Sequence, residues 1–259
     1  MKLFSITEVF RLWTSHIIFN FFGFRIKTQE GSLLYSLLYP FRQNSDNGKN
    51  NRIIFIENGV EKQVIFNRKY KGFCVNFYGN NNTLIIDKSC KLVKSNFIFD
   101  CSNSIIKIEG KANGKWQIAM YGNNCSASIG ENSFSADTSI FLVDNSIEVG
   151  KDCMFSNNVR IITDAHSVLD SNSKEVLNVP TKPIKIGNHI WLGERTTLTK
   201  NAQIPNDCIV GIASVVTKSF NEEHCVIAGS PARIVKQNVS WDWPHPRDYK
   251  AKFEKDSNE

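Results

Sequence analysis

Large aliphatic residues recur at every sixth position late in the chain, at Ile186, Leu192, Leu198, Ile204, Val210 and Val216. Four positions after each of the first five stand residues that are mostly small, namely Ile190, Thr196, Ala202, Cys208 and Ser214. An α-helix cannot keep positions six apart on one face over this length, whereas strands can, because six is a multiple of two. The pattern predicts short flat strands that each point one aliphatic side chain inward and end at a corner.

A longer repeat precedes this region. Four asparagines lie 21 residues apart, at Asn82, Asn103, Asn124 and Asn145. Four or five residues after each of them stands an apolar residue, which is followed by a small or acidic one. The sixfold pattern is already present at Val149, Phe155 and Ile161. We expect coils of about three six-residue strands each, stacked so that their aliphatic side chains form ladders.

The sixfold pattern is lost from Ser167 to Lys182 and resumes at Ile184. An insertion at a corner of a stacked coil must project as a loop, and loops on a rigid scaffold often carry catalytic groups.

The N-terminal region lacks these periods. The apolar stretch from Val9 to Phe24 carries Arg11, His16 and Asn20, and it is shorter than the ~20 apolar residues of a membrane-spanning helix. We expect a helix that packs on the rest of the protein, with an interfacial membrane helix as the alternative. A second short helix is expected over 33–38, and no secretory cleavage signal follows the apolar stretch.

Composition agrees with many short strands and tight corners. The 259 residues include 28 Ile and 28 Asn; Ile favours pleated surfaces, and Asn tolerates left-handed backbone. Hydrophobic content of 41% and charged content of 22% exclude a disordered or collagen-like chain. The net charge of +6 comes without a Lys/Arg run, which favours anionic ligands and argues against a nucleic-acid partner. Seven Cys without a CxxC pair predict buried, reduced thiols and a cytoplasmic protein.

The segments Ile186–Gly193, Val210–Lys218 and Ile227–Val235 resemble the hexapeptide-repeat acyltransferases. The resemblance implies an all-β solenoid, a left-handed parallel β-helix that is usually trimeric and transfers an acyl group from acyl-CoA. Within that family the chain is most similar to sugar and capsular polysaccharide O-acetyltransferases, including those that act on sialic acid polymers.

Four parts are expected along the chain. They are an N-terminal helical and loop segment (1–50), a strand-rich lead-in (51–80), the catalytic β-helix (81–236) with a projecting loop at about 167–182, and a short C-terminal tail (237–259). The tail begins with an aromatic, Pro-rich stretch, 241–247, that breaks every repeat. We expect it to pack on the end of the β-helix or to line an acceptor cleft.

The sequence Asp164-Ala165-His166-Ser167 directly precedes the insertion. A hydroxyl that attacks a thioester needs a general base, which His usually supplies and which contributes about 10²–10⁴ in rate. By the resemblance, His166 stands at the position of the family's catalytic His; the alternative is a surface His without a role. A carboxylate or a backbone carbonyl would orient the imidazole, and the candidates are Asp164, Asp152 and Asp170.

Trp191 occupies an outward position between inward Ile190 and Leu192. The resemblance implies that its ring lies beside the thioester, where the indole packs or its N–H donates to the carbonyl oxygen; an oxyanion donor contributes roughly 3 kcal/mol. Packing against the 167–182 loop or a neighbouring subunit is the alternative. His189, two residues earlier, is expected to be structural.

The resemblance also assigns the co-substrate site. Gly193 would leave room at the wall, the backbone of Ala213 would meet the pantetheine amide, and Lys218 and Arg233 would meet the nucleotide phosphates of acetyl-CoA. Each cation could instead be an ordinary surface charge. Ile212 departs from the small residue that the family prefers there, which could alter the fit of the pantetheine arm.

The resemblance therefore predicts an acetyl-CoA-dependent O-acetyltransferase that acts on a saccharide of a bacterial capsular or surface polysaccharide. It also implies a homotrimer with active sites at subunit interfaces. The cysteine usage places the protein in the bacterial cytoplasm, and the apolar N-terminal stretch is the candidate for peripheral membrane contact. The alternatives are an N-acetyltransferase on a nucleotide-amino sugar or small molecule, and a non-catalytic assembly module. A zinc enzyme is disfavoured and no metal is expected, because the five His lack the paired spacing of a three-His site.

Overall fold

The computed structural model describes residues 16–21, 24–29, 44–67 and 69–249. The chain divides into two compact units, Met1–Asn44 and Ser45–Glu259. No helix within the described ranges is long and apolar enough to cross a membrane.

The first unit contains a β-hairpin. Strand β1 (His16–Phe21) pairs antiparallel with β2 (Phe24–Gln29), with His16 opposite Gln29. The helix expected over Val9–Phe24 is therefore wrong for the described residues. A short apolar run rich in Ile and Phe suits a strand as well as a helix, and its β-branched and aromatic residues favour the strand. The helix expected over 33–38 lies outside the described residues.

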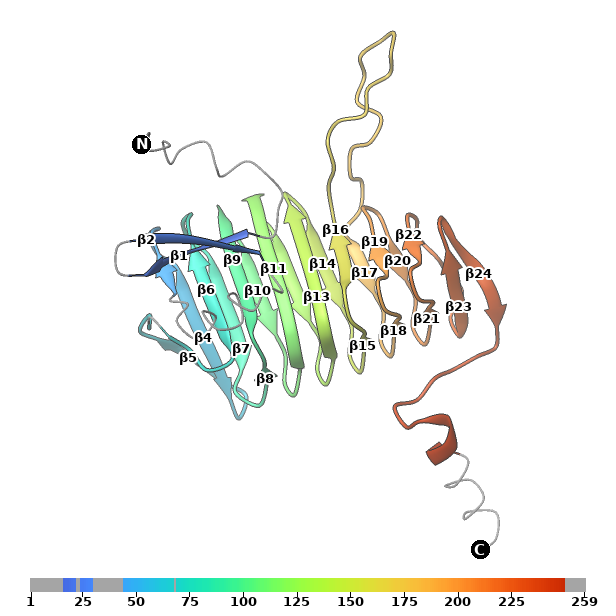
Figure 1. The fold of residues 1–259 in the computed structure, drawn as a ribbon, viewed down its shortest axis with the longest axis horizontal. Coiled ribbons are helices and arrows are strands. Elements are labelled where there is room, and N and C mark those ends of the chain that lie inside the picture. The colour runs from blue at the N-terminus through green and yellow to red at the C-terminus, as the bar shows by residue number, and fades with distance from the viewer. Residues whose placement is uncertain (1–15, 22–23, 30–43, 68, 250–259) are drawn as a thin grey trace, which may run out of the picture. The chain divides into compact units, whose positions relative to one another are not determined.

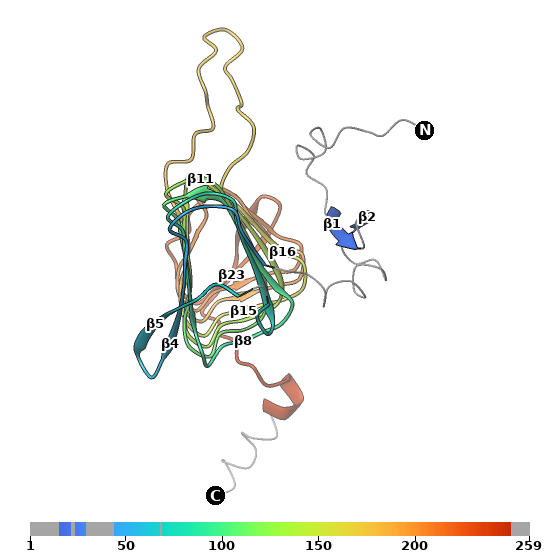
Figure 2. The ribbon, with the colours of Figure 1, turned by 90° about the vertical axis from the view of Figure 1, so that its left-hand side faces the viewer.

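The second unit is a parallel β-helix (Figure 1), and a view along its axis shows the coils superposed in one closed outline (Figure 2). This confirms the predicted fold class. The first face is an eight-stranded sheet of β20 (Gln203–Ile204), β17 (Ile184–Ile186), β14 (Ser146–Val149), β12 (Ser126–Ile129), β10 (Ile105–Ile108), β7 (Thr83–Asp87), β4 (Arg52–Glu57) and β5 (Val60–Val64).

The second face continues from the first around a corner. Its strands are β24 (Ala232–Gln237), β23 (Cys225–Gly229), β21 (Ile209–Val210), β18 (Trp191–Leu192), β15 (Met154–Phe155), β13 (Phe134–Val143), β11 (Asn113–Asn123), β9 (Ser95–Ser102), β6 (Phe73–Phe77) and β3 (Ser45–Asp46). A short β8 (Lys91–Leu92) pairs with β11. Strands β3, β4 and β6 already belong to the parallel ladders. The solenoid therefore begins before residue 81, with β3 inside the segment expected as helical and loop (1–50) and β4 and β6 inside the expected lead-in (51–80).

The third face is formed by β16 (Val159–Ile162), β19 (Thr197–Leu198) and β22 (Val215–Val216). Strand β13 pairs with β15 through Phe134 and Ser135, and with β16 through 138–141. One long strand of the N-terminal coils thus gives way to two short strands, on two faces, in the C-terminal coils. At the two ends of the solenoid, β5 pairs antiparallel with β4 and β24 pairs antiparallel with β23.

The interior is filled by the predicted ladders. All six residues of the sixfold series are buried, with exposed fractions of at most 3%, and the five residues at the offset of four are 0% exposed. Six of the seven cysteines are also buried, as expected. Burial raises the pKa of Cys153 and that of Cys225 to about 12, so these thiols stay protonated at neutral pH.

The corners between faces are turned by residues in the left-handed backbone region. Between the first and second faces, one column with φ from 54° to 59° comprises Lys111, Asn132, Asp152, His189, Asp207 and His224. Between the second and third faces, the corresponding column is Asn158, Arg195 and Ala213. We call these columns the first and second corner columns. The N–H of each of the last two residues donates to the preceding coil, Arg195 to the Asn157 carbonyl at 3.0 Å and Ala213 to the Glu194 carbonyl at 2.8 Å.

The 21-residue asparagine series marks a further corner. Asn103 and Asn124 have φ of 55°, as their expected role in turning corners requires. In the first coil of the series Asn81 takes this conformation instead, and Asn82 is fully buried. The Asn82 Nδ2 donates to the Cys101 carbonyl at 2.8 Å, and its Oδ1 accepts from the Ser104 N–H at 3.1 Å.

We predict that Asn82→Ala lowers the free energy of unfolding by roughly 2–4 kcal/mol, because it leaves a buried carbonyl and a buried N–H without partners. Chemical denaturation monitored by circular dichroism measures this. The control is Asn123→Ala, at an exposed position on the same side of the coil, which is expected to change stability by less than about 0.5 kcal/mol. Equal losses in the two variants would contradict a buried hydrogen-bonding role for Asn82.

Candidate active site

The projecting loop expected from the broken period is present. It joins β16 to β17 and extends away from the body of the solenoid (Figures 1 and 2). Its two arms are held together by an antiparallel bridge between Leu169 and Val176 and by the Leu177 N–H, which donates to the Val168 carbonyl at 2.8 Å.

His166 lies near the base of this loop with its side chain exposed. Asn178, on the opposite arm, holds the backbone here: its Nδ2 donates to the His166 carbonyl at 2.9 Å, and its Oδ1 accepts from the Val168 N–H at 2.8 Å. The Asn178 carbonyl also accepts from Lys200 Nζ at 2.6 Å. Sequence reasoning missed Asn178, because a single sequence carries no sign of a pairing between arms.

The three carboxylates considered as orienting groups are engaged elsewhere. Asp164 Oδ1 accepts from the Ala165 N–H at 2.7 Å. Asp170 Oδ1 accepts from the Ser173 and Asn172 N–H groups, which lowers the pKa of this carboxyl. Asp152 lies in the first corner column, where its Oδ1 accepts from Asn132 Nδ2 at 2.7 Å. Within the described part of the chain, none of them is hydrogen-bonded to the His166 imidazole.

Trp191 begins β18, with Met154 and Ile209 as its register neighbours on the adjacent coils. It is half-buried, whereas Ile190 and Leu192 are 0% exposed, so its expected outward position is confirmed. Its Nε1–H donates to Ser156 Oγ at 3.3 Å.

The structure does not bring His166 and Trp191 together within one chain. The loop leaves the solenoid at the corner after β16, and β17 and the next corner separate it from Trp191. In Figure 2 the loop projects from the top of the outline, while β15, the sheet neighbour of β18, lies in its lower part. The two groups can serve one reaction only if another copy of the chain supplies one of them.

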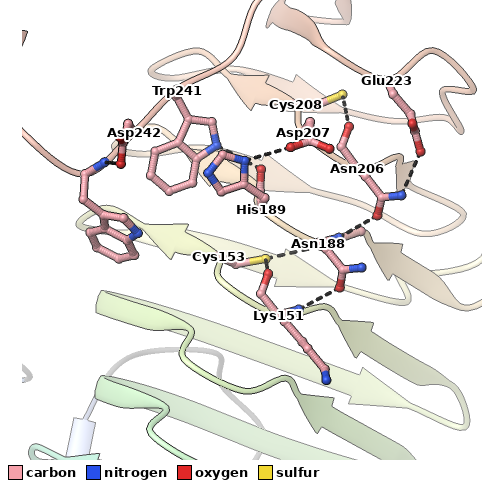
Figure 3. Close-up of polar contacts among 12 residues, drawn as sticks. Lys151, Cys153, Asn188, His189, Asn206, Asp207, Cys208, Glu223, Trp241 and Asp242 are labelled. Atoms are coloured by element: carbon pink, nitrogen blue, oxygen red, sulfur yellow. Dashed lines mark hydrogen bonds and ion pairs between the residues drawn. The ribbon is translucent and has the colours of Figure 1, made fainter. Parts of the chain in front are cut away.

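His189 lies in the first corner column beside the C-terminal tail (Figure 3). Its Nδ1 is 2.8 Å from Asp207 Oδ1. The Trp241 ring stacks on the imidazole, with centroids 4.5 Å apart and planes 10° apart. The tail therefore returns to the second face near Trp191, rather than only covering the end of the solenoid.

The expected co-substrate residues lie in two places. Ala213 is exposed in the second corner column, next to Ile212, which is 63% exposed. Lys218 and Arg233 line one open depression of about 510 Å³ with Phe220 and Glu222. Lys218 Nζ lies 5.4 Å from the centre of the Phe220 ring. The two cations predicted to meet phosphates are thus on one surface.

Gly193 is required by the packing of the coils themselves. A Cβ at this position would lie 2.7 Å from the Ile212 nitrogen and 2.9 Å from the Val210 oxygen, which is too close for backbone atoms that cannot move aside. The absence of a side chain at Gly193 therefore has a structural cause, whatever binds on the outside.

No family model matches the chain. The polysialic acid O-acetyltransferase of Neisseria meningitidis is 37% identical over 165 residues, which cover 63% of this chain and 76% of that protein. The chain belongs to the hexapeptide-repeat O-acetyltransferases. Its fold matches the crystal structure of the polysialic-acid-specific acetyltransferase NeuO with a TM-score of 0.66 and 25% identity, covering 80% of this chain and 89% of that one. The polysialic acid O-acetyltransferase OatWY matches with a TM-score of 0.52 and 27% identity over 82% and 97% of the two chains.

The family assignment makes the protein an acyltransferase. Across the described ranges, no three His, Cys, Asp or Glu side chains are grouped so that they could hold a metal ion.

We predict that Gly193→Ala destabilises this acyltransferase by about 1–3 kcal/mol, because the added methyl group forces adjacent coils apart. Thermal unfolding of the purified protein measures the loss. Gly211→Ala is the matched control, since its Cβ would meet the Ala228 methyl at 3.1 Å and no backbone atom closer than 3.8 Å, and a smaller loss is expected. Unchanged stability in Gly193→Ala would show that the coils can accommodate a side chain there.

Proposed function

We propose that the protein transfers an acetyl group from acetyl-CoA to a hydroxyl of a bacterial capsular or surface polysaccharide, with sialic acid polymers as the first candidate acceptors. The observation that carries this proposal is the 37% identity to a polysialic acid O-acetyltransferase over three quarters of that protein. The exposed His166 on a projecting loop and the paired cations Lys218 and Arg233 supply groups that such a reaction needs.

His166 acts in this proposal as the general base. Its imidazole takes the proton from the acceptor hydroxyl, the oxygen attacks the thioester carbonyl, and the C–S bond breaks in the tetrahedral intermediate. The departing thiolate takes the proton back from the imidazolium, so no covalent enzyme intermediate forms. The Asn178 side chain fixes the His166 backbone, which leaves the imidazole to be oriented by the substrates or by a second subunit.

Trp191 serves the thioester end of the same reaction. Its indole packs beside the thioester, or its Nε1–H donates to the carbonyl oxygen as negative charge develops there. In the structure this N–H donates to Ser156 Oγ, so the second role requires that acetyl-CoA replace the serine hydroxyl as its acceptor.

The co-substrate would extend from Ala213 toward the depression formed by Lys218 and Arg233. The Ala213 N–H already donates to the Glu194 carbonyl at 2.8 Å. A pantetheine amide would therefore donate its own N–H to the Ala213 carbonyl oxygen. The nucleotide phosphates then meet Lys218 as a point charge and Arg233 as a planar fork.

A homotrimer completes the site in this proposal, with the active sites at subunit interfaces. Support comes from the separation of the His166 loop and Trp191 by β17 within one chain. The enzyme would work in the bacterial cytoplasm, where acetyl-CoA is available. The N-terminal unit remains a candidate for peripheral membrane contact.

Thiol release from acetyl-CoA tests the activity. We expect release with polysialic acid or another polysaccharide acceptor, and His166→Ala should lower it by about 10²–10⁴-fold because the general base is lost. Asn172→Ala, at an exposed position of the same loop, should retain wild-type activity.

Three outcomes would overturn parts of this proposal. Wild-type enzyme that releases thiol only with nucleotide-amino sugars or small amines would make it an N-acetyltransferase. No acceptor-dependent release at all would leave a non-catalytic β-helix. Full activity in His166→Ala would remove His166 as the base while leaving the transfer reaction in place.

The phosphate assignment predicts that Lys218→Ala or Arg233→Ala raises KM for acetyl-CoA by roughly tenfold, because a charged hydrogen bond is lost. Acetyl-pantetheine, which lacks the nucleotide phosphates, should show no difference between wild type and variant. Lys236→Ala, an exposed cation of the same strand β24, is the control. A KM increase of the same size for acetyl-pantetheine would point to a general disturbance of the end coil.

A further inference from the structure

The C-terminal tail carries a tryptophan that is held unusually firmly for a segment outside any strand. Trp241 is only 8% exposed. Its Nε1–H donates to the His189 carbonyl at 2.9 Å, and its ring stacks on the imidazole of the same residue. Both the polar edge and one face of the indole are thus fixed by one corner residue, 52 positions earlier in the chain (Figure 3).

His189 is a rigid support because its own geometry is fixed on both sides. Its backbone N–H donates to the Lys151 carbonyl at 2.8 Å on the preceding coil. Its Nδ1 is paired with Asp207 Oδ1 at 2.8 Å on the following coil. Asp207 lies in the same first corner column, with φ of 58°. The imidazole plane that carries Trp241 is therefore set by three successive coils of the solenoid.

Trp191 also lies close to Trp241. Their ring centroids are 6.2 Å apart and the planes are tilted by 47°. The indole N–H of Trp191 donates to Ser156 Oγ. The outward indole of Trp191 therefore has two supports, one serine hydroxyl and the tail tryptophan.

We infer that Trp241 is a positioning residue for Trp191, and that the His189–Asp207 pair holds Trp241 in place. This inference rests on the proposed acetyl transfer, in which Trp191 lies beside the thioester. A group that acts on a thioester must be held in a narrow range of positions, and an indole on a solenoid wall has little to hold it from the outside. The tail supplies that support, although it belongs to none of the repeats.

The neighbouring Trp243 provides an internal comparison. It is 46% exposed and contacts Trp241 at 5.6 Å and Phe134 at 6.2 Å between ring centroids. It lies in the same tail and is the same residue type, and the ring contacts of the described residues connect it to Trp191 only through Trp241. Its removal should therefore leave Trp191 nearly undisturbed.

Four variants test the inference: Trp241→Ala, Trp241→Phe, His189→Asn and Trp243→Ala. Asn is chosen at position 189 because it tolerates the left-handed backbone of this corner while removing the ring. With polysialic acid as acceptor, Trp241→Ala should lower kcat/KM for acetyl-CoA by roughly 10–100-fold and leave KM for the acceptor unchanged. His189→Asn should show a smaller loss of the same kind, Trp241→Phe should recover part of the activity, and Trp243→Ala should resemble wild type.

A second readout does not depend on turnover. In protein labelled with 5-fluorotryptophan, the ¹⁹F resonance of Trp191, assigned with Trp191→Phe, should shift or broaden in Trp241→Ala and His189→Asn but not in Trp243→Ala. An unchanged resonance in both variants would overturn the inference, and so would activity losses matched by Trp243→Ala. If wild-type enzyme shows no acetyl transfer, the proposed function fails, and the resonance alone decides whether Trp241 positions Trp191.

Discussion

The fold requires the chain to turn a corner after each short strand while the backbone at that corner still hydrogen-bonds to the adjacent coil. Each corner residue takes a left-handed conformation that costs roughly 1–2 kcal/mol for most L-amino acids. At most of these corners its N–H donates to the carbonyl that precedes the corner of the adjacent coil, as Ala213 does to Glu194, and at Lys111 it donates to the Ser89 hydroxyl instead. Asn, Asp and His are well suited to this position, because their short polar side chains can also bond along the column. Asn132 with Asp152, and His189 with Asp207, are two such pairs.

The same constraint decides where chemistry can take place. Inward positions are filled by aliphatic ladders, and coil spacing excludes even a methyl group at Gly193. Reactive groups are therefore confined to the outward wall, the corners, an insertion or the tail. The candidate site uses each of these: Trp191 on the wall, Ala213 at a corner, His166 in the insertion and Trp241 in the tail.

Much of this arrangement can be predicted from the sequence, because the periods follow directly from packing. A six-residue spacing of large aliphatic residues predicts an inward ladder, and the loss of this spacing at Ser167 predicts the loop that carries His166. The N-terminal hairpin could not be predicted in this way, since a short apolar run without a period fits helix or strand, and only its β-branched and aromatic content favours the strand. Contacts between distant segments were also out of reach. Neither the link from Asn178 to His166 nor the stacking of Trp241 on His189 leaves a pattern along the chain.

The two antiparallel strands at the ends of the solenoid also affect whether two solenoids can join end to end. A stack of parallel coils presents, at each end, an open edge that another stack could join, and repeated joining would give a filament. Strand β5 covers the edge of the first face at one end and β24 covers that of the second face at the other, and both run antiparallel to the strand that they pair with. Both carry exposed charges, Glu61 and Lys62 in β5 and Arg233 and Lys236 in β24. Together these charged antiparallel strands disfavour end-to-end polymerisation of the solenoid.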